Sequence, residues 1–217
     1  MMKRTCVFFV FLFAALNMSA QGKFCKSYDD FVAGRWTEVA DLKPIHHSAS
    51  HKLWVGGNDY KFETGDKAMD KVMKKEAFVI EYQDTLYVNL RTLRFEKTRF
   101  GNGYAMGLPY DGTKIMFVTH RIGRDAANER FVSGFMFGAI GAAISGSSQL
   151  KDRVCYLVDN NGDGKKTDIT LINDEFMENL LELDRPLLKT YRSEKKQKDR
   201  ESAAHVLPIL KEKGLVK

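Results

Sequence analysis

Two stretches with the residue pattern of paired β-strands constrain the fold of this chain more than any other feature. In residues 78–90, FVIEYQDTLYVNL, large apolar residues stand at every second position on both sides of the polar pair Gln83–Asp84. In residues 110–120, YDGTKIMFVTH, the dipeptide Asp111–Gly112 favours a tight turn, and Ile115, Phe117 and Thr119 alternate with Met116 and Val118 in the stretch that follows. Because a period of two places every second side chain on the same face of a strand, both stretches predict β-hairpins and an antiparallel sheet.

Helical patterns occur before and after these hairpins. Apolar residues recur at helical spacing from Ala68 to Met73 with lysines opposite, which predicts a helix at about 66–76 that crosses the sheet. Residues 173–217 read as helical, with Pro186 in a first turn and Pro208 kinking or splitting the last segment. The expected fold class is α+β: an antiparallel β-sheet of hairpins with a crossing helix and a C-terminal helical arm. Residues 21–217 are expected to form a single domain, because there is no linker or repeat.

The first twenty residues, MMKRTCVFFVFLFAALNMSA, have the organisation of a secretory signal peptide. Lys3 and Arg4 precede an apolar run from Cys6 to Leu16, and small or polar residues follow. Such a run is too short to cross a bilayer core of roughly 30 Å as a helix. We therefore expect cleavage after Ala20 and export to the periplasm, the cell exterior or the outer membrane.

Charge is distributed unevenly along the remaining chain. Residues 185–217 contain ten Lys or Arg residues and four Asp or Glu residues, whereas the rest of the expected mature chain is slightly acidic. A nucleic-acid partner is not expected, because the body lacks the basic excess that phosphate binding requires. A solvated helix face is the favoured interpretation of the basic end, and contact with anionic lipid or polysaccharide is the alternative.

Two cysteines, Cys25 and Cys155, remain after removal of Cys6 with the signal peptide. An even pair in an oxidising compartment predicts a disulfide between them, and two inert thiols are the alternative. A bridge across so long a loop would stabilise the fold by roughly 4–5 kcal/mol in the chain-entropy model.

A polar loop at residues 159–170 resembles part of a calcium-binding loop. Calcium takes six to eight oxygen ligands, and an EF-hand loop supplies them at fixed positions around a central glycine. Thr170 stands where the bidentate Glu belongs, and the flanking residues read as strands. A hairpin turn without metal is therefore favoured over weak calcium binding, and no other cofactor is expected. The candidate ligands are Asp159, Asn161, Asp163, Lys165 and Asp168.

A glycine-rich apolar segment, residues 131–146, has small residues at every fourth position. A helix with this spacing would have one smooth face for close packing. Three interpretations remain open: a buried helix or connection, a self-association face that would make a homo-oligomer, and a segment that contacts or enters a membrane. The small residues are Gly134, Gly138, Ala142 and Gly146.

The succession NDYKFETGDKAM, AFVIEYQDTLYVNLRTLRF, RFGNGYAMG, a glycine-rich segment, a YLVD strand and a lysine-rich end resembles a family of uncharacterised exported proteins of Bacteroidota bacteria. This resemblance implies an envelope location and no known activity. The chain also lacks the motifs G-x-S-x-G, H-E-x-x-H and the P-loop. The leading hypothesis is a non-enzymatic envelope module that binds a ligand or a protein through its sheet or its glycine-rich segment. The alternative is an envelope-polymer hydrolase that uses carboxylates near residues 159–168.

Overall fold

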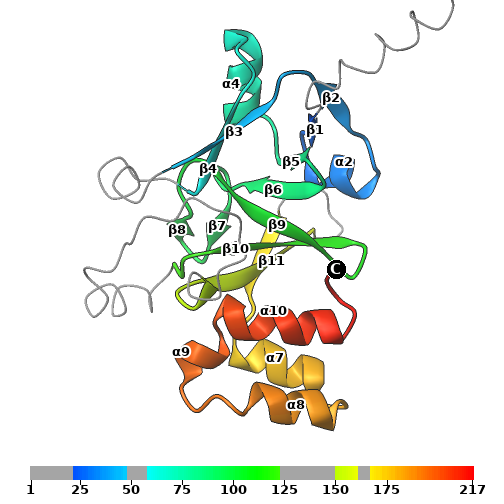
Figure 1. Ribbon diagram of the computed structural model, residues 1–217, viewed down its shortest axis with the longest axis vertical. Coiled ribbons are helices and arrows are strands. Elements are labelled where there is room, and N and C mark those ends of the chain that lie inside the picture. Colours follow the sequence, from blue (N-terminus) through cyan, green and yellow to red (C-terminus); the bar gives the residue numbers. More distant parts are fainter. Residues whose placement is uncertain (1–21, 48–57, 123–149, 161–166) are drawn as a thin grey trace, which may run out of the picture.

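The computed structural model describes residues 22–47, 58–122, 150–160 and 167–217 (Figure 1). The described residues form one large antiparallel sheet, whose main path runs β12-β11-β10-β9-β6-β5-β1-β2. A side branch, β3 and β4, joins this path where Tyr60 of β4 pairs with Tyr104 of β9. The sheet contains ten strands: β1 (Gly22–Cys25), β2 (Thr37–Val39), β3 (Lys43–His46), β4 (Tyr60–Glu63), β5 (Val79–Tyr82), β6 (Thr85–Asn89), β9 (Tyr104–Tyr110), β10 (Lys114–Thr119), β11 (Val154–Asn160) and β12 (Thr167–Leu171).

Both predicted hairpins are present. Strands β5 and β6 pair from Val79↔Val88 to Tyr82↔Thr85, with Gln83 and Asp84 between them. Strands β9 and β10 pair up to Tyr110↔Lys114, around the Asp111–Gly112 turn. A small separate sheet, β7 (Arg94–Phe95) with β8 (Thr98–Arg99), lies between these hairpins in the chain. The α+β class with an antiparallel sheet is therefore confirmed.

The helix predicted at about 66–76 and the predicted helical C-terminal arm are both present, and a short helix near the start of the described chain adds to them. Helix α2 (Tyr28–Val32) follows the N-cap Ser27, and α4 (Lys67–Lys75) follows the N-cap Asp66. The C-terminal arm comprises α7 (Asp174–Leu181), α8 (Arg185–Tyr191), α9 (Gln197–Arg200) and α10 (Ala203–Glu212). Pro208 lies inside α10 and does not split it, although it removes one backbone donor.

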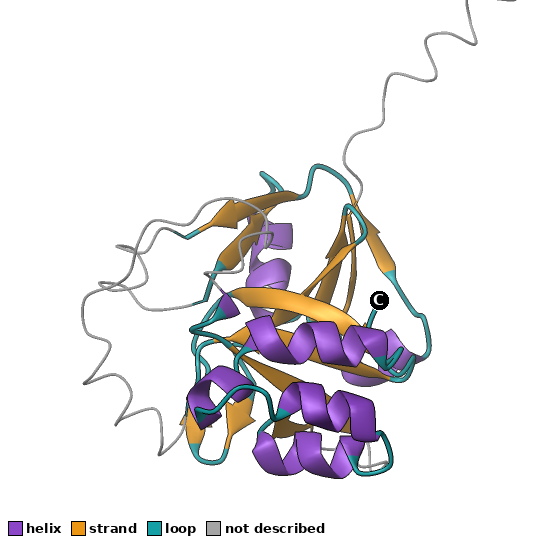
Figure 2. Ribbon diagram, turned by 60° about the horizontal axis from the view of Figure 1, so that its bottom comes forward, coloured by secondary structure: helices purple, strands orange, loops and turns teal. Residues whose placement is uncertain are grey.

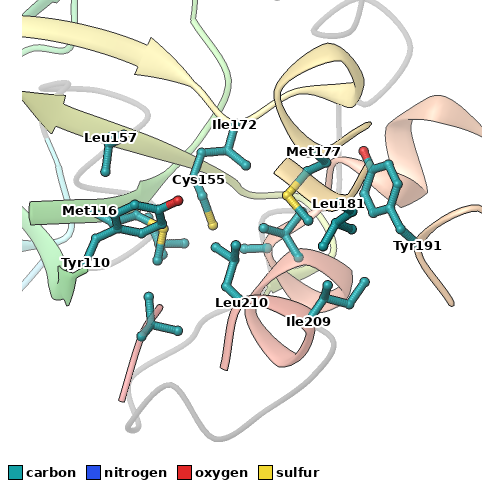
Figure 3. Packing of buried hydrophobic residues seen from close by; sticks show 14 of the residues in the cluster. Tyr110, Met116, Cys155, Leu157, Ile172, Met177, Leu181, Tyr191, Ile209 and Leu210 are labelled. Carbon is teal, nitrogen blue, oxygen red and sulfur yellow. The ribbon is translucent and has the colours of Figure 1, made fainter. Parts of the chain in front are cut away.

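Helices cover one face of the sheet at its two ends (Figure 1). At one end, α4 places Met73 against Ile80, Phe62 and Tyr104. At the other end, the C-terminal helices pack on β9, β10 and β11, so that Met177, Leu181 and Leu210 meet Met116, Cys155 and Leu157 (Figure 3). Figure 2 shows these helices in front of the sheet when the lower end of the molecule comes forward.

The opposite face of the sheet has its own apolar cluster. Phe100, Phe117 and Tyr156 form its aromatic centre, with ring centroids 4.8 to 5.4 Å apart. Side chains from α2, from Trp36 and from the β7–β8 hairpin pack against this cluster. Because every second side chain of a strand faces the same way, the two faces together bury nearly all apolar positions of the central strands.

The predicted disulfide between Cys25 and Cys155 is wrong in this structure. Both cysteines are free and buried, and four strands separate β1 from β11 in the sheet. Cys25 donates its thiol hydrogen to the carbonyl oxygen of Arg35, with a distance of 3.3 Å between Sγ and the oxygen. Cys155 packs among the apolar residues beneath the C-terminal helices. A disulfide requires Cα atoms within about 7 Å, which this strand order prevents.

Candidate ligand-binding surface

Between α4 and the C-terminal helices, one face of the sheet carries tyrosines that are only half-buried. Tyr60 comes from β4, Tyr82 from β5 and Tyr87 from β6, while His46 of β3 lies exposed beside them. All three tyrosines pack around the cluster that contains the buried side chain of Phe62. We call His46, Tyr60, Tyr82 and Tyr87 the tyrosine surface.

Local sequence determines how β4 reaches the sheet and brings Tyr60 to this surface. Gly103, with φ of 97°, precedes β9 at the point where Tyr60 pairs with Tyr104. A Cβ atom at Gly103 would lie 2.9 Å from the carbonyl oxygen of Tyr60, so only glycine allows this approach. The buried Asn58 side chain donates hydrogen bonds to the carbonyl oxygens of Phe100 and Asn102, at 3.3 and 3.2 Å.

An ion pair adds a second attachment beside β4. Nη1 and Nη2 of Arg153 both donate to the carboxylate of Asp59, with 3.0 Å between Nη2 and Oδ1. The two side chains are almost fully buried. Removing one partner of such a pair leaves an uncompensated charge, so the pair holds β4 and β11 in one arrangement.

The rings of the tyrosine surface pack edge to face. The ring centroids of Tyr60 and Tyr87 are 5.0 Å apart, as are those of Phe62 and Tyr87. Tyr82 lies 6.4 Å from Phe62, and His46 lies 5.1 Å from Tyr60, again between centroids. These edge-to-face contacts fix the ring orientations before any ligand arrives, which reduces the entropy lost on binding.

The hydroxyl groups of the three half-buried tyrosines differ from those of Tyr28, Tyr104 and Tyr191, which are hydrogen-bonded. Within the described part of the chain, no hydrogen bond is made by the hydroxyls of Tyr60, Tyr82 and Tyr87. By contrast, Tyr104 donates to the carbonyl oxygen of Met73, and Tyr191 donates to Asp174. The surface thus offers flat apolar rings together with hydroxyls that can bond a ligand.

Burial controls the protonation of these hydroxyls. Desolvation raises the pKa of Tyr60 and the pKa of Tyr87 above the ordinary value. Asp59 adds a smaller increase to the pKa of Tyr60, and Tyr60 and Tyr82 add smaller increases to the pKa of Tyr87. Both hydroxyls therefore stay neutral at physiological pH and can both donate and accept hydrogen bonds. A neutral polar ligand with an apolar face fits this chemistry better than an anion does.

The loop proposed for calcium connects two paired strands, as the turn interpretation requires. Asp159 of β11 and Asp168 of β12 lie opposite each other, while Asn161, Asp163 and Lys165 lie outside the described residues. Among the residues that the structure describes, no group of three or more His, Cys, Asp or Glu side chains is placed to hold a metal. Calcium binding by this loop therefore stays a prediction.

Asp159 already has a cationic partner. Its carboxylate accepts a hydrogen bond from the Lys114 ammonium at 2.8 Å. Burial alone would raise the pKa of Asp159, but hydrogen bonds from Lys114 and from the Asn160 amide hold this pKa below its usual range. A glycosidase acid needs the opposite shift, so this carboxylate lacks the property that the hydrolase alternative requires of a proton donor.

The two cysteines lack the reactivity of a nucleophile. Burial raises the pKa of Cys25 to about 12, with the Asp30 carboxylate adding to the effect, and burial alone raises the pKa of Cys155 to about 12. The thiolate is the nucleophilic form of cysteine, so both side chains are chemically inert at neutral pH. Of the two predictions made for these cysteines, the structure agrees with two inert thiols and not with a disulfide.

The three interpretations of the glycine-rich segment concern residues outside the described part of the chain. Gly134, Gly138, Ala142 and Gly146 all lie outside the described residues. In the described parts of the chain, no helix is long and apolar enough to cross a membrane.

Sequence patterns singled out the calcium-type loop and the cysteines but missed the tyrosine surface. Tyr82 and Tyr87 were visible only as members of a hairpin, and β3 was not predicted around Pro44. The one sequence signal for this surface was the number of tyrosines within residues 60–87. Aliphatic side chains would pack on a sheet face equally well, so packing alone does not require tyrosine at these positions.

These features define a class: an α+β protein with one antiparallel sheet, helices at two ends of one sheet face, and an aromatic surface between them. The chain belongs to a family of unknown function, DUF6563, whose model matches residues 23–217. Neither a curated protein nor a solved structure matches the chain.

Proposed function

We propose that the chain is an exported envelope protein that binds a neutral glycan of the envelope through the tyrosine surface and catalyses no reaction. The observation that carries this proposal is the set of three half-buried tyrosine rings whose hydroxyls make no hydrogen bond within the described part of the chain. A sugar ring has an apolar face that packs on an aromatic ring and hydroxyls that bond to neutral partners, so both properties of the surface are used.

Support for export comes from the sequence. The signal-peptide pattern of residues 1–20 ends just before residue 23, where the family match begins. An exported chain meets the glycans of the cell envelope, which is why this ligand class is preferred to a cytoplasmic metabolite.

The test uses hydroxyl deletions that keep the rings and therefore the fold. The triple variant Tyr60→Phe, Tyr82→Phe, Tyr87→Phe is compared with Tyr28→Phe, whose hydroxyl donates to the carbonyl oxygen of Thr113 at 3.0 Å. Binding of peptidoglycan fragments and of neutral oligosaccharides is measured by titration calorimetry. We expect the triple variant to bind at least about tenfold more weakly, because each lost hydrogen bond contributes about 0.5–1.5 kcal/mol. The Tyr28 variant should bind like the wild type.

Two results would contradict the proposal. Equal affinity of the triple variant and the wild type would remove the tyrosine surface from binding. Release of smaller glycan products, abolished by Asp159→Asn or Asp168→Asn, would replace binding by the hydrolase alternative. Association through residues 131–146 is a separate alternative, for which carbonate extraction of the membrane fraction is the test.

A further inference from the structure

Helix α8 lies at the end of the molecule opposite α4 (Figure 1), and its exposed side is basic. Arg185, Lys189 and Arg192 are four and three residues apart, so they lie on one side of the helix and its C-cap. The buried residues Leu187 and Tyr191 lie on the opposite side, against the apolar core. All three basic side chains are exposed, as are Lys195 and Lys196 after the helix. We call these five residues the α8 basic face.

Few acidic groups neutralise this face. Residues 185–198 contain six Lys or Arg residues and a single acidic one, Glu194. Arg192 pairs with Glu178 at 2.9 Å, but within the described part of the chain the other four members make no ion pair. An exposed helix that serves only for solubility commonly pairs its charges along the helix, and α8 itself contains no acidic residue.

An exposed apolar side chain adjoins the same face. Leu183, in the turn between α7 and α8, is 98% exposed, more than any other large apolar residue that the structure describes. It precedes Arg185 by two residues, at the N-terminal end of the basic face. Full exposure of one leucine costs little by itself, but it adds an apolar group to this end of the basic face. Leu183 lies between Glu182 and Asp184 in the chain, and Asp184 is already paired with Lys213 at 3.6 Å.

The helix behind this face is held rigidly. Arg200 donates to Asp174 from Nε at 3.0 Å and from Nη2, while Tyr191 donates to the same carboxylate at 2.6 Å. Glu201 accepts hydrogen bonds from Arg121 and from the backbone amide of Asp174, which joins the helices to the end of β10. The basic side chains therefore project from a fixed support.

We propose that the α8 basic face docks on an anionic phospholipid surface, with Leu183 entering the headgroup region. Each Lys or Arg near such a surface contributes attraction, and clusters of four to eight are typical of lipid-binding segments. Binding to a bilayer would bury the exposed leucine side chain at the boundary between headgroups and acyl chains, which is favourable. A soluble anionic polymer has no apolar region in which this side chain could be buried. The site lies on the arm, apart from the tyrosine surface, and does not depend on the proposed function.

The experiment measures co-sedimentation of the chain from Gln21, the expected mature form, with lipid vesicles. One set contains phosphatidylcholine alone, and the other contains phosphatidylcholine mixed with phosphatidylglycerol. The test variant is Arg185→Gln, Lys189→Gln, Lys196→Gln. The matched control, Lys67→Gln, Lys71→Gln, Lys74→Gln, removes the same charge from the exposed face of α4. We expect binding to the mixed vesicles to fall about 100-fold in the test variant and much less in the control.

A second variant separates a bilayer from other anions. Leu183→Ser should weaken binding to the mixed vesicles severalfold, because the inserted side chain is lost. Equal losses in the α8 and α4 variants would show attraction by overall charge and would overturn the proposal. Unchanged binding by Leu183→Ser, or wild-type binding that does not depend on phosphatidylglycerol, would overturn it as well.

Discussion

Cys25 and Cys155 illustrate how strongly a single side chain depends on its surroundings. Both side chains are almost completely buried, and they lie apart from each other without a disulfide. Removing a thiolate from water is costly, so burial keeps both groups in the protonated form. The pair therefore contributes to the fold as two small buried side chains, Cys155 in the cluster beneath the C-terminal helices and Cys25 beside the Arg35 carbonyl oxygen.

We expect both thiols to be unreactive in the native chain from Gln21 and both to be modified after unfolding. The raised pKa of each, about 12, leaves almost no thiolate at neutral pH, and burial blocks the reagent. Alkylation with iodoacetamide without reductant, in buffer and in denaturant, followed by intact mass measurement, checks this. The disulfide prediction would be correct if the chain stayed unmodified in denaturant and ran as a faster band on a non-reducing gel, and if Cys25→Ser abolished that faster band.

Among the elements, the C-terminal helices are joined by charged groups as well as by apolar packing. Asp174, at the start of α7, accepts from Tyr191 of α8 and Arg200 of α9. Burial alone would raise the pKa of Asp174, but the hydrogen bonds from Arg200 and Tyr191 hold it below the usual range. His205 of α10 lies 2.9 Å from the Tyr191 carbonyl oxygen, measured from Nε2. The four C-terminal helices thereby act as one unit.

We expect Asp174→Asn to lower the free energy of unfolding by about 2 kcal/mol at neutral pH, because charge-assisted hydrogen bonds are lost. The folded pKa of Asp174 is depressed, so its contribution is fully present above about pH 4, the ordinary Asp value, and is lost as pH falls through the folded pKa. The difference between wild type and variant should therefore shrink in acid. Urea unfolding across this pH range measures it.

The control for this measurement is Asp199→Asn, which changes an exposed carboxylate of the same arm. It should leave the free energy of unfolding nearly unchanged at every pH. A constant difference between Asp174→Asn and wild type down to strongly acidic pH would contradict the assigned role of the carboxylate.

At the scale of the whole molecule, the sheet is the common support of both apolar clusters. Strands β10 and β11 place Met116 and Leu157 under the C-terminal helices, and they place Phe117 and Tyr156 in the opposite cluster. Because alternate residues of the same strands serve both faces, neither cluster can open without disturbing the other. The arm at 174–212 and the sheet should accordingly unfold together.

We expect one cooperative unfolding transition that includes the sheet and the arm. Ile209→Ala in α10 removes a buried side chain and should lower the free energy of unfolding by about 2–5 kcal/mol. In a Trp54→Phe background, Trp36 reports on the opposite face of the sheet. Its fluorescence and the far-ultraviolet circular dichroism should give the same urea midpoint, lowered equally by Ile209→Ala. A shift of the circular dichroism alone would show that the arm unfolds separately.

Local sequence determined the elements of this protein. Strand alternation around Gln83–Asp84 and Asp111–Gly112 predicted two hairpins, and helical spacing from Ala68 to Met73 predicted α4, because these patterns depend only on neighbours along the chain. The Gln83–Asp84 turn even tolerates φ angles of 49° and 58° without glycine, since the flanking strands pair on both sides.

Tertiary structure alone decided which distant residues meet. The order of the strands separates Cys25 from Cys155, and no local pattern specifies that order. The tyrosine surface draws on four strands and requires the single pairing of Tyr60 with Tyr104, which Gly103 permits. The α8 basic face was readable as a run of charges, but packing of Leu187 and Tyr191 determined which side of the helix faces outward. Contacts between residues far apart in sequence depend on the folded core, and this is why the sites emerged only from the structure.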